Sequence, residues 1–170
     1  VSSKNVIKHY AEGFGIEKER VIPTGIPRTD IFFDDLYKQK VRERLYEEYP
    51  FLKDKKVIMF APTFRGNGQQ SAYYPMEVLD LKKIYEDLHE EYVFLFKIHP
   101  FVKNDITIPY QFSEFYYDFS SYREINDLLF ITDILITDYS SVCFEFALLN
   151  KPMIFFAYDI EEYVRTRDFY

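Results

Sequence analysis

The sequence predicts one α/β domain, a mostly parallel β-sheet with helices on both faces. Short apolar runs, typical of strands buried on both faces, alternate along the chain with stretches whose apolar residues recur at helical spacing. With 170 residues, 48% of them hydrophobic, the chain can bury the core of one domain but is too short for two of ordinary size. Strands that alternate with helices in this way favour a parallel sheet covered on both sides.

The first 24 residues are not typical of the start of a domain, and we interpret them as the tail of a preceding domain or a linker. They contain one short helical pattern, for which Ser2 or Ser3 is the cap, and a two-residue apolar strand at 21–22. The predicted domain spans residues 25–170. It begins with a turn whose glycine and proline fix the backbone.

Strand and helix patterns then follow one another along the predicted domain. We expect strands at 57–61, 92–99, 115–119, 133–137 and 152–157, and helices at 36–49, 76–91, 122–130 and 141–149. The spacing of Ser121 and Glu124 matches a capping box, which predicts that the third of these helices starts at residue 122. Residues 66–75 are expected to form a flexible polar loop, and the chain after residue 157 a tail without a closing helix.

Composition argues against some classes of function. The net charge of -7 argues against general nucleic-acid binding, because that needs many Lys and Arg side chains to neutralise phosphates, so a phosphate ligand would need a local positive pocket. The single cysteine, Cys143, lies on the apolar side of a predicted helix and is interpreted as a packing residue, with a reactive thiol as the alternative. The sequence has no signal-peptide pattern and no run of roughly 20 apolar residues, so we expect a cytoplasmic protein that is at most peripheral to a membrane.

A predicted strand gives way to a helix at the four residues Asp138-Tyr139-Ser140-Ser141. The first turn of a helix leaves backbone N–H groups unpaired, and the macrodipole adds partial positive charge there. Two hydroxyls are also available as caps. This combination favours a phosphate site, with an ordinary helix cap as the alternative.

Polar side chains follow three of the predicted strands. They are Thr63 and Arg65 after the first, Lys97 and His99 at the end of the second, and Asp138, Ser140 and Ser141 after the fourth. Because the carboxyl ends of parallel strands share one edge of a sheet, these groups can converge into an anion site. The alternatives are an ordinary loop after the first strand, a structural histidine at the second, and a local ion pair between Arg28 and Asp30 in the opening turn.

Four motifs resemble one known family. GIPRTD (25–30), APTFRG (61–66), KIHP (97–100) and the stretch from INDLL to FFAYD (125–159) are similar to the C-terminal domain of the CDP-glycerol glycerophosphotransferases, which build teichoic-acid chains in Gram-positive bacteria. The resemblance covers residues 21–170 and implies the second of two Rossmann-like domains in a GT-B architecture, the domain that mainly holds the nucleotide. The His-Pro and Ser-rich motifs are also similar to those of bacterial polysialyltransferases, which use CMP-activated sialic acid.

The resemblance implies roles for particular residues. His99 would be one of two catalytic histidines, the other belonging to a His-Gly-Thr motif that would precede Val1. The implied contacts to CDP-glycerol are Arg28, Thr63, Arg65, Lys97, Asp138, Ser140, Ser141 and Glu145. Glu145 stands where the family typically has Asp. No carboxylate cluster predicts a metal site, and no cofactor is expected.

The implied function is transfer of glycerol phosphate from CDP-glycerol to a growing poly(glycerol phosphate) teichoic-acid-type acceptor, with release of CMP. The alternatives are another donor for a capsule or wall polymer, such as CDP-ribitol, CMP-sialic acid or a UDP-sugar, or a noncatalytic nucleotide-binding module. We expect the acceptor, a polyol phosphate or glycan, to be attached to a lipid carrier. An N-terminal acceptor domain would complete the enzyme at the inner face of the cell membrane, and the isolated 170 residues should bind the donor without polymerising.

Overall fold

The computed structural model describes residues 1–103 and 106–167 and divides the chain into two compact units. The larger unit, Leu36–Tyr158, contains the sheet. The smaller unit combines Val1–Asp35 with the segment that begins at Asp159. The sequence placed the boundary after residue 24 instead. The structure keeps residues 25–35 with the N-terminus, where the Gly25 N–H donates to the Val1 carbonyl.

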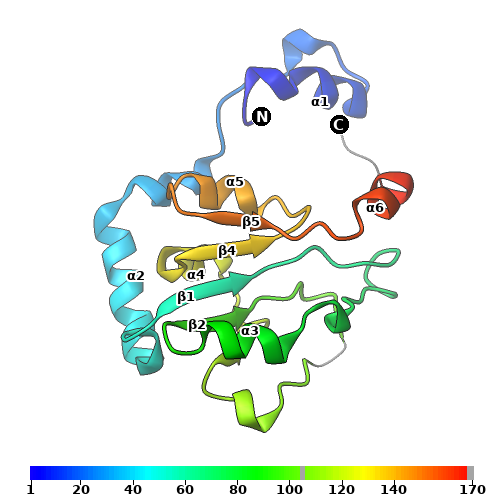
Figure 1. The fold of residues 1–170 in the computed structure, drawn as a ribbon. Coiled ribbons are helices and arrows are strands. Elements are labelled where there is room, and N and C mark those ends of the chain that lie inside the picture. Colours follow the sequence, from blue (N-terminus) through cyan, green and yellow to red (C-terminus); the bar gives the residue numbers. More distant parts are fainter. Residues whose placement is uncertain (104–105, 168–170) are drawn as a thin grey trace. The chain divides into compact units, whose positions relative to one another are not determined.

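The larger unit is built on a five-stranded sheet in which every pairing is parallel (Figure 1). The strands are β1 (Lys56–Phe60), β2 (Tyr92–Phe96), β3 (Tyr116–Asp118), β4 (Ile134–Thr137) and β5 (Met153–Phe155), in the order β3-β2-β1-β4-β5. β1 lies at the centre, since Val57 is opposite Val93 of β2 and Ile58 is opposite Ile134 of β4. The chain builds outward from β1 in both directions, so a topological switch point lies between β1 and β4. The predicted α/β class is confirmed.

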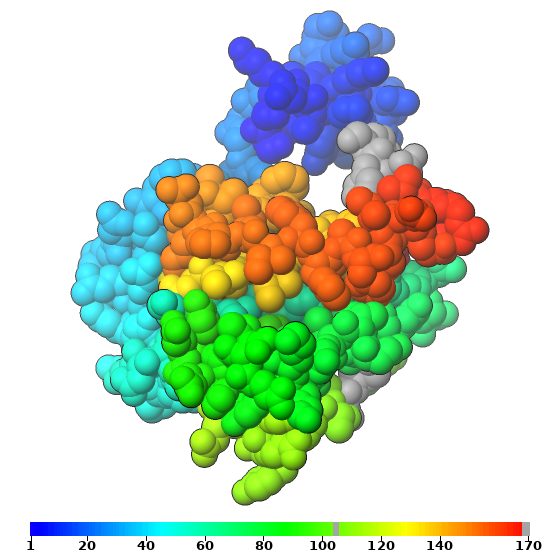
Figure 2. Space-filling model, viewed as in Figure 1, coloured from blue at the N-terminus to red at the C-terminus, as the bar shows by residue number. Residues whose placement is uncertain are grey.

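Helices cover both faces of this sheet. α3 (Leu81–Leu88) packs on an aromatic core that includes Phe60, Phe94 and Tyr116. It lies in front of β2 in the view of Figure 1, and its green atoms are exposed on the face that Figure 2 shows. α4 (Ile125–Ile131) lies behind the sheet in Figure 1, as expected for right-handed crossovers that run in opposite directions along it. The other helices of this unit are α2 (Asp35–Glu48) and α5 (Val142–Ala147).

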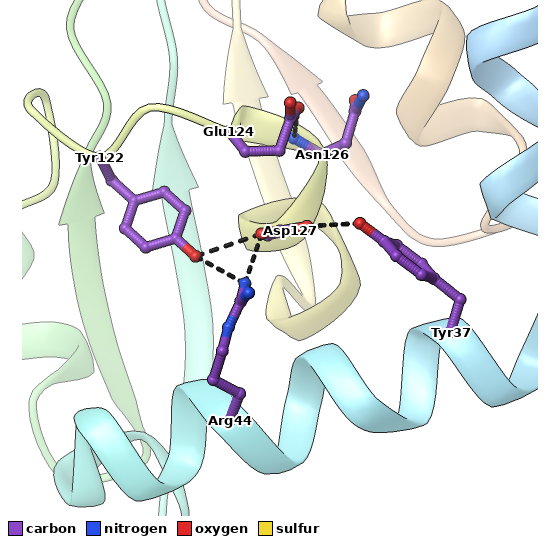
Figure 3. A network of polar contacts seen from close by, with 6 residues as sticks. All are labelled: Tyr37, Arg44, Tyr122, Glu124, Asn126 and Asp127. Carbon is purple, nitrogen blue, oxygen red and sulfur yellow. Dashed lines mark hydrogen bonds and ion pairs between the residues drawn. The ribbon is translucent and has the colours of Figure 1, made fainter.

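α2 and α4 are joined by a polar cluster around the buried carboxylate of Asp127 (Figure 3). An Arg44 Nη donates to this carboxylate at 2.5 Å, and the Tyr122 hydroxyl donates to the same oxygen at 3.2 Å. The Tyr37 hydroxyl lies 3.4 Å from the other oxygen. The cluster neutralises a charge that would otherwise be buried alone between the two helices.

The smaller unit contains α1 (Ile7–Phe14) and α6 (Ile160–Thr166). The predicted N-terminal helix is present, and Ser3 caps the short 3₁₀ turn that precedes it by accepting from the Asn5 N–H at 3.3 Å. α6 is a correction, because the sequence predicted a tail without a helix here. In the part of the chain that the structure describes, no helix has the length and apolar character needed to cross a membrane.

Several predicted boundaries are wrong, each for a local reason. Residues 21–22 join no β-ladder of the described chain, and the Ile22 carbonyl accepts from the N-terminal amine instead. The helix expected at 76–91 begins only at Leu81, because Asp80 caps it by accepting from the Lys83 N–H. The capping box is also wrong. Glu124 is itself the cap, and its carboxylate accepts from the Asn126 N–H.

Candidate functional site

The segments that leave β1, β2 and β4 lie side by side at the carboxyl edge of the sheet. The ladder continues past the strand ends, where the Lys97 N–H donates to the Phe60 carbonyl and the Ala61 N–H donates to the Ile136 carbonyl, both at 2.9 Å. The sequence predicted a strand at 92–99 that included Lys97 and His99. This boundary is wrong, because β2 ends at Phe96 and both residues follow the strand. The three groups of polar residues are thus brought to one edge by the strand order.

Asp138 connects the ends of β1 and β4. One carboxylate oxygen accepts from the Thr63 N–H at 2.7 Å and from the Tyr139 N–H at 2.6 Å. The other oxygen accepts from an Arg65 Nη at 2.9 Å, and the second Nη of Arg65 donates to the Thr63 carbonyl at 2.5 Å. The Arg65 and Asp138 side chains are 10% and 1% exposed, so this is a buried ion pair whose charges balance each other.

Three tyrosine rings lie close to the guanidinium of Arg65. The ring centroids of Tyr139, Tyr74 and Tyr158 lie 5.2, 5.5 and 5.8 Å from its central carbon, within cation–π range. Tyr74 is buried, and the Arg65 backbone pairs with Tyr73 in an antiparallel bridge. Residues 66–75 were expected to form a flexible loop. Instead, this segment folds back on itself, because the bridge pairs Tyr73 with Arg65.

Lys97 is buried and connects the end of β2 to the turn after β3. Its ammonium donates to the Ser120 carbonyl at 2.9 Å, while the Ser120 hydroxyl accepts from the Ile98 N–H at 3.1 Å. Burial lowers the pKa of Lys97, and the nearby Asp118 carboxylate partly offsets this effect. Ser120 was missed by the sequence analysis, although it follows a predicted strand just as the other site residues do.

His99 packs against two aromatic rings that also contact each other. Its centroid lies 4.9 Å from that of Phe64 and 4.5 Å from that of Phe101, and its Nδ1 accepts from the Phe101 N–H at 3.1 Å. Because Nδ1 is the acceptor, the neutral ring carries its hydrogen on Nε2. Burial and the Lys97 ammonium lower the pKa of His99 from its ordinary value of 6.5, so the ring is neutral near pH 7.

The hydroxyls of the site differ in their surroundings. The Thr63 Oγ1 is a buried atom that has no hydrogen-bond partner within the described residues. The Ser140 Oγ accepts from the Val142 N–H at 3.4 Å, whereas Ser141 is exposed and its side chain makes no capping bond. α5 has only six residues, so its macrodipole is a weaker source of positive charge than the sequence pattern suggested.

The other two predicted contacts are Glu145 and Arg28. Glu145 is buried within α5. Arg28 is exposed in the 3₁₀ helix Pro27–Phe33 of the smaller unit, where the sequence had predicted a turn. Over the ranges 1–103 and 106–167, no group of three or more His, Cys, Asp or Glu side chains is arranged to hold a metal ion. The contact of each predicted residue with a nucleotide stays a prediction.

Comparison with known proteins identifies the family. The family described as "CDP-Glycerol:Poly(glycerophosphate) glycerophosphotransferase" matches residues 1–170. The teichoic acid poly(ribitol-phosphate) polymerase of Bacillus spizizenii is 72% identical over 170 residues, 100% of this chain and 28% of the relative. The teichoic acid ribitol-phosphate polymerase TarK of Staphylococcus aureus is 51% identical over 172 residues, again 100% of this chain and 33% of the relative.

A solved structure agrees with these relatives. A variant of the wall teichoic acid polymerase TagF with CDPG superposes on the chain with a TM-score of 0.82 at 32% identity, over 100% of this chain and 42% of that one. The chain spans less than half the length of each of these relatives. Since the family pattern matches every residue, the chain belongs to the CDP-glycerol:poly(glycerophosphate) glycerophosphotransferase family, as the motifs predicted.

Proposed function

We propose that this chain forms the donor-binding part of an enzyme that transfers a polyol phosphate from a CDP-activated polyol to a growing teichoic acid chain, releasing CMP. The observation that carries the proposal is the convergence of Lys97, His99 and the Ser140 turn at one edge of the sheet, in a chain of this family. In open α/β sheets, ligands bind at the carboxyl ends of the strands, next to the topological switch point.

Ribitol phosphate is the first polyol phosphate to test. Both curated relatives described above are ribitol-phosphate polymerases by name, and they match this chain at 72% and 51% identity. The TagF structure with CDPG matches at 32% identity, and the sequence motifs alone implied CDP-glycerol. We therefore propose CDP-ribitol as the preferred donor and CDP-glycerol as the second.

The proposed reaction is a phosphoryl transfer. An acceptor hydroxyl attacks the β-phosphorus of the donor, a new P–O bond forms, and the bond between this phosphorus and the oxygen of CMP breaks. CMP leaves with that electron pair, and the hydroxyl proton goes to a general base, which the family motifs assign to the histidine of a His-Gly-Thr motif. Such reactions depend mainly on positioning and on stabilising the charge around phosphorus.

His99 contributes as a neutral donor in this proposal. If Nδ1 were protonated, its hydrogen would point at the hydrogen of the Phe101 N–H, and the hydrogen bond between them would be lost. The Lys97 ammonium further disfavours a positively charged ring. The neutral ring instead offers Nε2–H to a phosphate oxygen of the donor, where it can stabilise developing charge on the leaving group. The Lys97 ammonium adds positive charge near the ring.

We also propose that the acceptor is a polymer attached to a lipid carrier. A polymer attached to a lipid carrier would bring the reaction to the cytoplasmic face of the membrane, and the acceptor half of the cleft would come from a second domain, as in the GT-B arrangement the motifs imply.

The test is donor titration by calorimetry together with an assay of CMP release, using the protein at its full natural length and a polyol-phosphate primer. CDP-ribitol, CDP-glycerol, CMP-sialic acid and a UDP-sugar are compared. Binding and primer-dependent release with a CDP-polyol support the proposal. Binding without any release would indicate a noncatalytic nucleotide-binding module, and preference for CMP-sialic acid or a UDP-sugar would contradict the donor class.

A further inference from the structure

We propose that Arg65 and Asp138 act as a positioning pair, which fixes the segment after β1 against the turn after β4, and that neither side chain contacts the donor. This inference rests on the proposed function. It changes the role that the sequence motifs implied for both residues, from direct contacts of the nucleotide to supports of the residues that do contact it.

The bonding of the pair is the first reason. Both carboxylate oxygens of Asp138 and both terminal nitrogens of Arg65 form hydrogen bonds within the protein. If Arg65 turned to a phosphate, it would leave a carboxylate that is 1% exposed without its counter-charge. Breaking a buried ion pair in this way is strongly unfavourable.

The surroundings of Arg65 are the second reason. The rings of Tyr74, Tyr139 and Tyr158 all lie within 6 Å of the guanidinium carbon, at 5.5, 5.2 and 5.8 Å, and pack against the side chain. Its backbone is fixed by the bridge to Tyr73, in which the two N–H···O bonds measure 2.7 and 3.1 Å. A side chain that is enclosed by packing within the protein is suited to hold a site in shape.

The bonds of the pair end on the backbone next to the candidate donor contacts. The N–H of Thr63 is held by Asp138 and its carbonyl by Arg65. These bonds fix the residue whose buried Oγ1 has no hydrogen-bond partner among the residues that the structure describes. On the other side, Asp138 holds the N–H of Tyr139, the residue directly before Ser140. The pair therefore sets the distance between two hydroxyls that belong to different strand ends.

The decisive variant is Asp138→Asn in the full-length protein, measured for donor affinity, KM and kcat. If the pair positions the site, freeing Arg65 misplaces both segments, donor binding weakens, and kcat/KM falls on the order of 10²-fold, as expected for a small displacement of a reacting geometry. If Arg65 instead contacts the donor phosphates, removing its competitor leaves donor affinity unchanged or stronger. That second result would overturn the inference.

Arg65→Lys is the second variant, because it keeps the positive charge but loses the planar fork that spans Asp138 and Thr63. We expect it to fold and to lose about tenfold or more in kcat/KM. Wild-type kcat/KM in this variant would contradict the positioning role. In a double-mutant cycle with Arg65→Met and Asp138→Asn, the two losses should not add, because either change breaks the same pair.

The chain offers a matched control in Asp127→Asn. Asp127 is likewise a buried carboxylate bonded to an arginine, Arg44, but it lies between α2 and α4 (Figure 3). This variant should lower the melting temperature and leave kcat/KM per folded molecule unchanged. If the wild-type protein binds no CDP-polyol, the proposed function and the inference both fail. If it binds and the Asp138 variant binds equally well, only the inference fails.

Discussion

The backbone N–H of Phe101 donates to Nδ1 of His99 at 3.1 Å, and this bond determines which nitrogen of the imidazole can face a ligand. His89 makes the opposite kind of bond. Its Nδ1 lies 2.8 Å from the Tyr85 carbonyl oxygen, which can only accept, so this Nδ1 carries the hydrogen. The two histidines thus present opposite tautomers. Only His99 follows the carboxyl end of a strand.

Replacement of His99 by Ala should reduce kcat about 10²–10³-fold, the usual contribution of one hydrogen-bond donor that stabilises charge in the transition state, with a much smaller loss of donor affinity. The assay is CMP release by the full-length protein with primer. His89→Ala is the matched control and should retain wild-type turnover. Robust turnover by the His99 variant would refute the assigned role.

His99 should titrate below pH 6.5 in the folded protein. Its pKa is lowered from 6.5 by burial and by Lys97, so the folded protein binds this proton less readily than the unfolded chain. Its contribution to stability is complete above pH 6.5 and is lost as the pH falls through the lowered pKa. An NMR titration of the ring proton checks this, and a midpoint above 6.5 would be inconsistent with it.

Replacement of Lys97 by Met should raise the pKa of His99, because it removes the positive charge that disfavours the imidazolium. The same NMR titration measures the change. Lys103→Met serves as the control, since Lys103 is an exposed residue that has no part in the lowered pKa of His99. An unchanged midpoint in the Lys97 variant would show that burial alone is responsible.

Ser140→Ala and Arg28→Ala should each weaken donor binding by roughly 1–3 kcal/mol, the range for loss of a hydrogen bond to a charged group. Calorimetric titration of the full-length variants with the preferred CDP-polyol provides the measurement. Arg20→Ala, another exposed arginine in a 3₁₀ turn of the smaller unit, is the control for Arg28. Equal affinities in all of these proteins would exclude both residues from the site.

Gly66→Ala should destabilise the fold by about 1–3 kcal/mol, because Gly66 has φ +91° and an added Cβ would lie 2.0 Å from the Ser71 carbonyl oxygen. Gly13→Ala is the matched control. Gly13 lies inside α1 with no atom within 4 Å of an added Cβ, so Ala should be neutral or stabilise by roughly 0.5–1 kcal/mol. Thermal unfolding of both variants decides the comparison. Equal melting temperatures would contradict the expected strain.

The central strands β1 and β2 could be predicted because they are buried along almost their whole length and so leave unbroken apolar runs, as in residues 57–60. The meeting of the strand ends followed from parallel topology alone. The pairing of Arg65 with Asp138 could not be predicted, since the two are 73 residues apart and each side chain by itself is equally suited to a ligand. The start of α4 was predicted wrongly because two capping residues were available. Glu124 was assigned to a capping box with Ser121, whereas it is itself the N-cap of α4.

The central place of β1 also bears on how the chain folds. β1 is the first strand in sequence, yet both of its neighbours come later: Val57 pairs with Val93, and Ile58 pairs with Ile134. During synthesis the central strand of the sheet therefore remains unpaired until partners far along the chain have been made. Such non-local pairings slow folding and prolong the exposure of unpaired strand edges. Substitutions in β4 should then delay the completion of the sheet more than equivalent substitutions in β2.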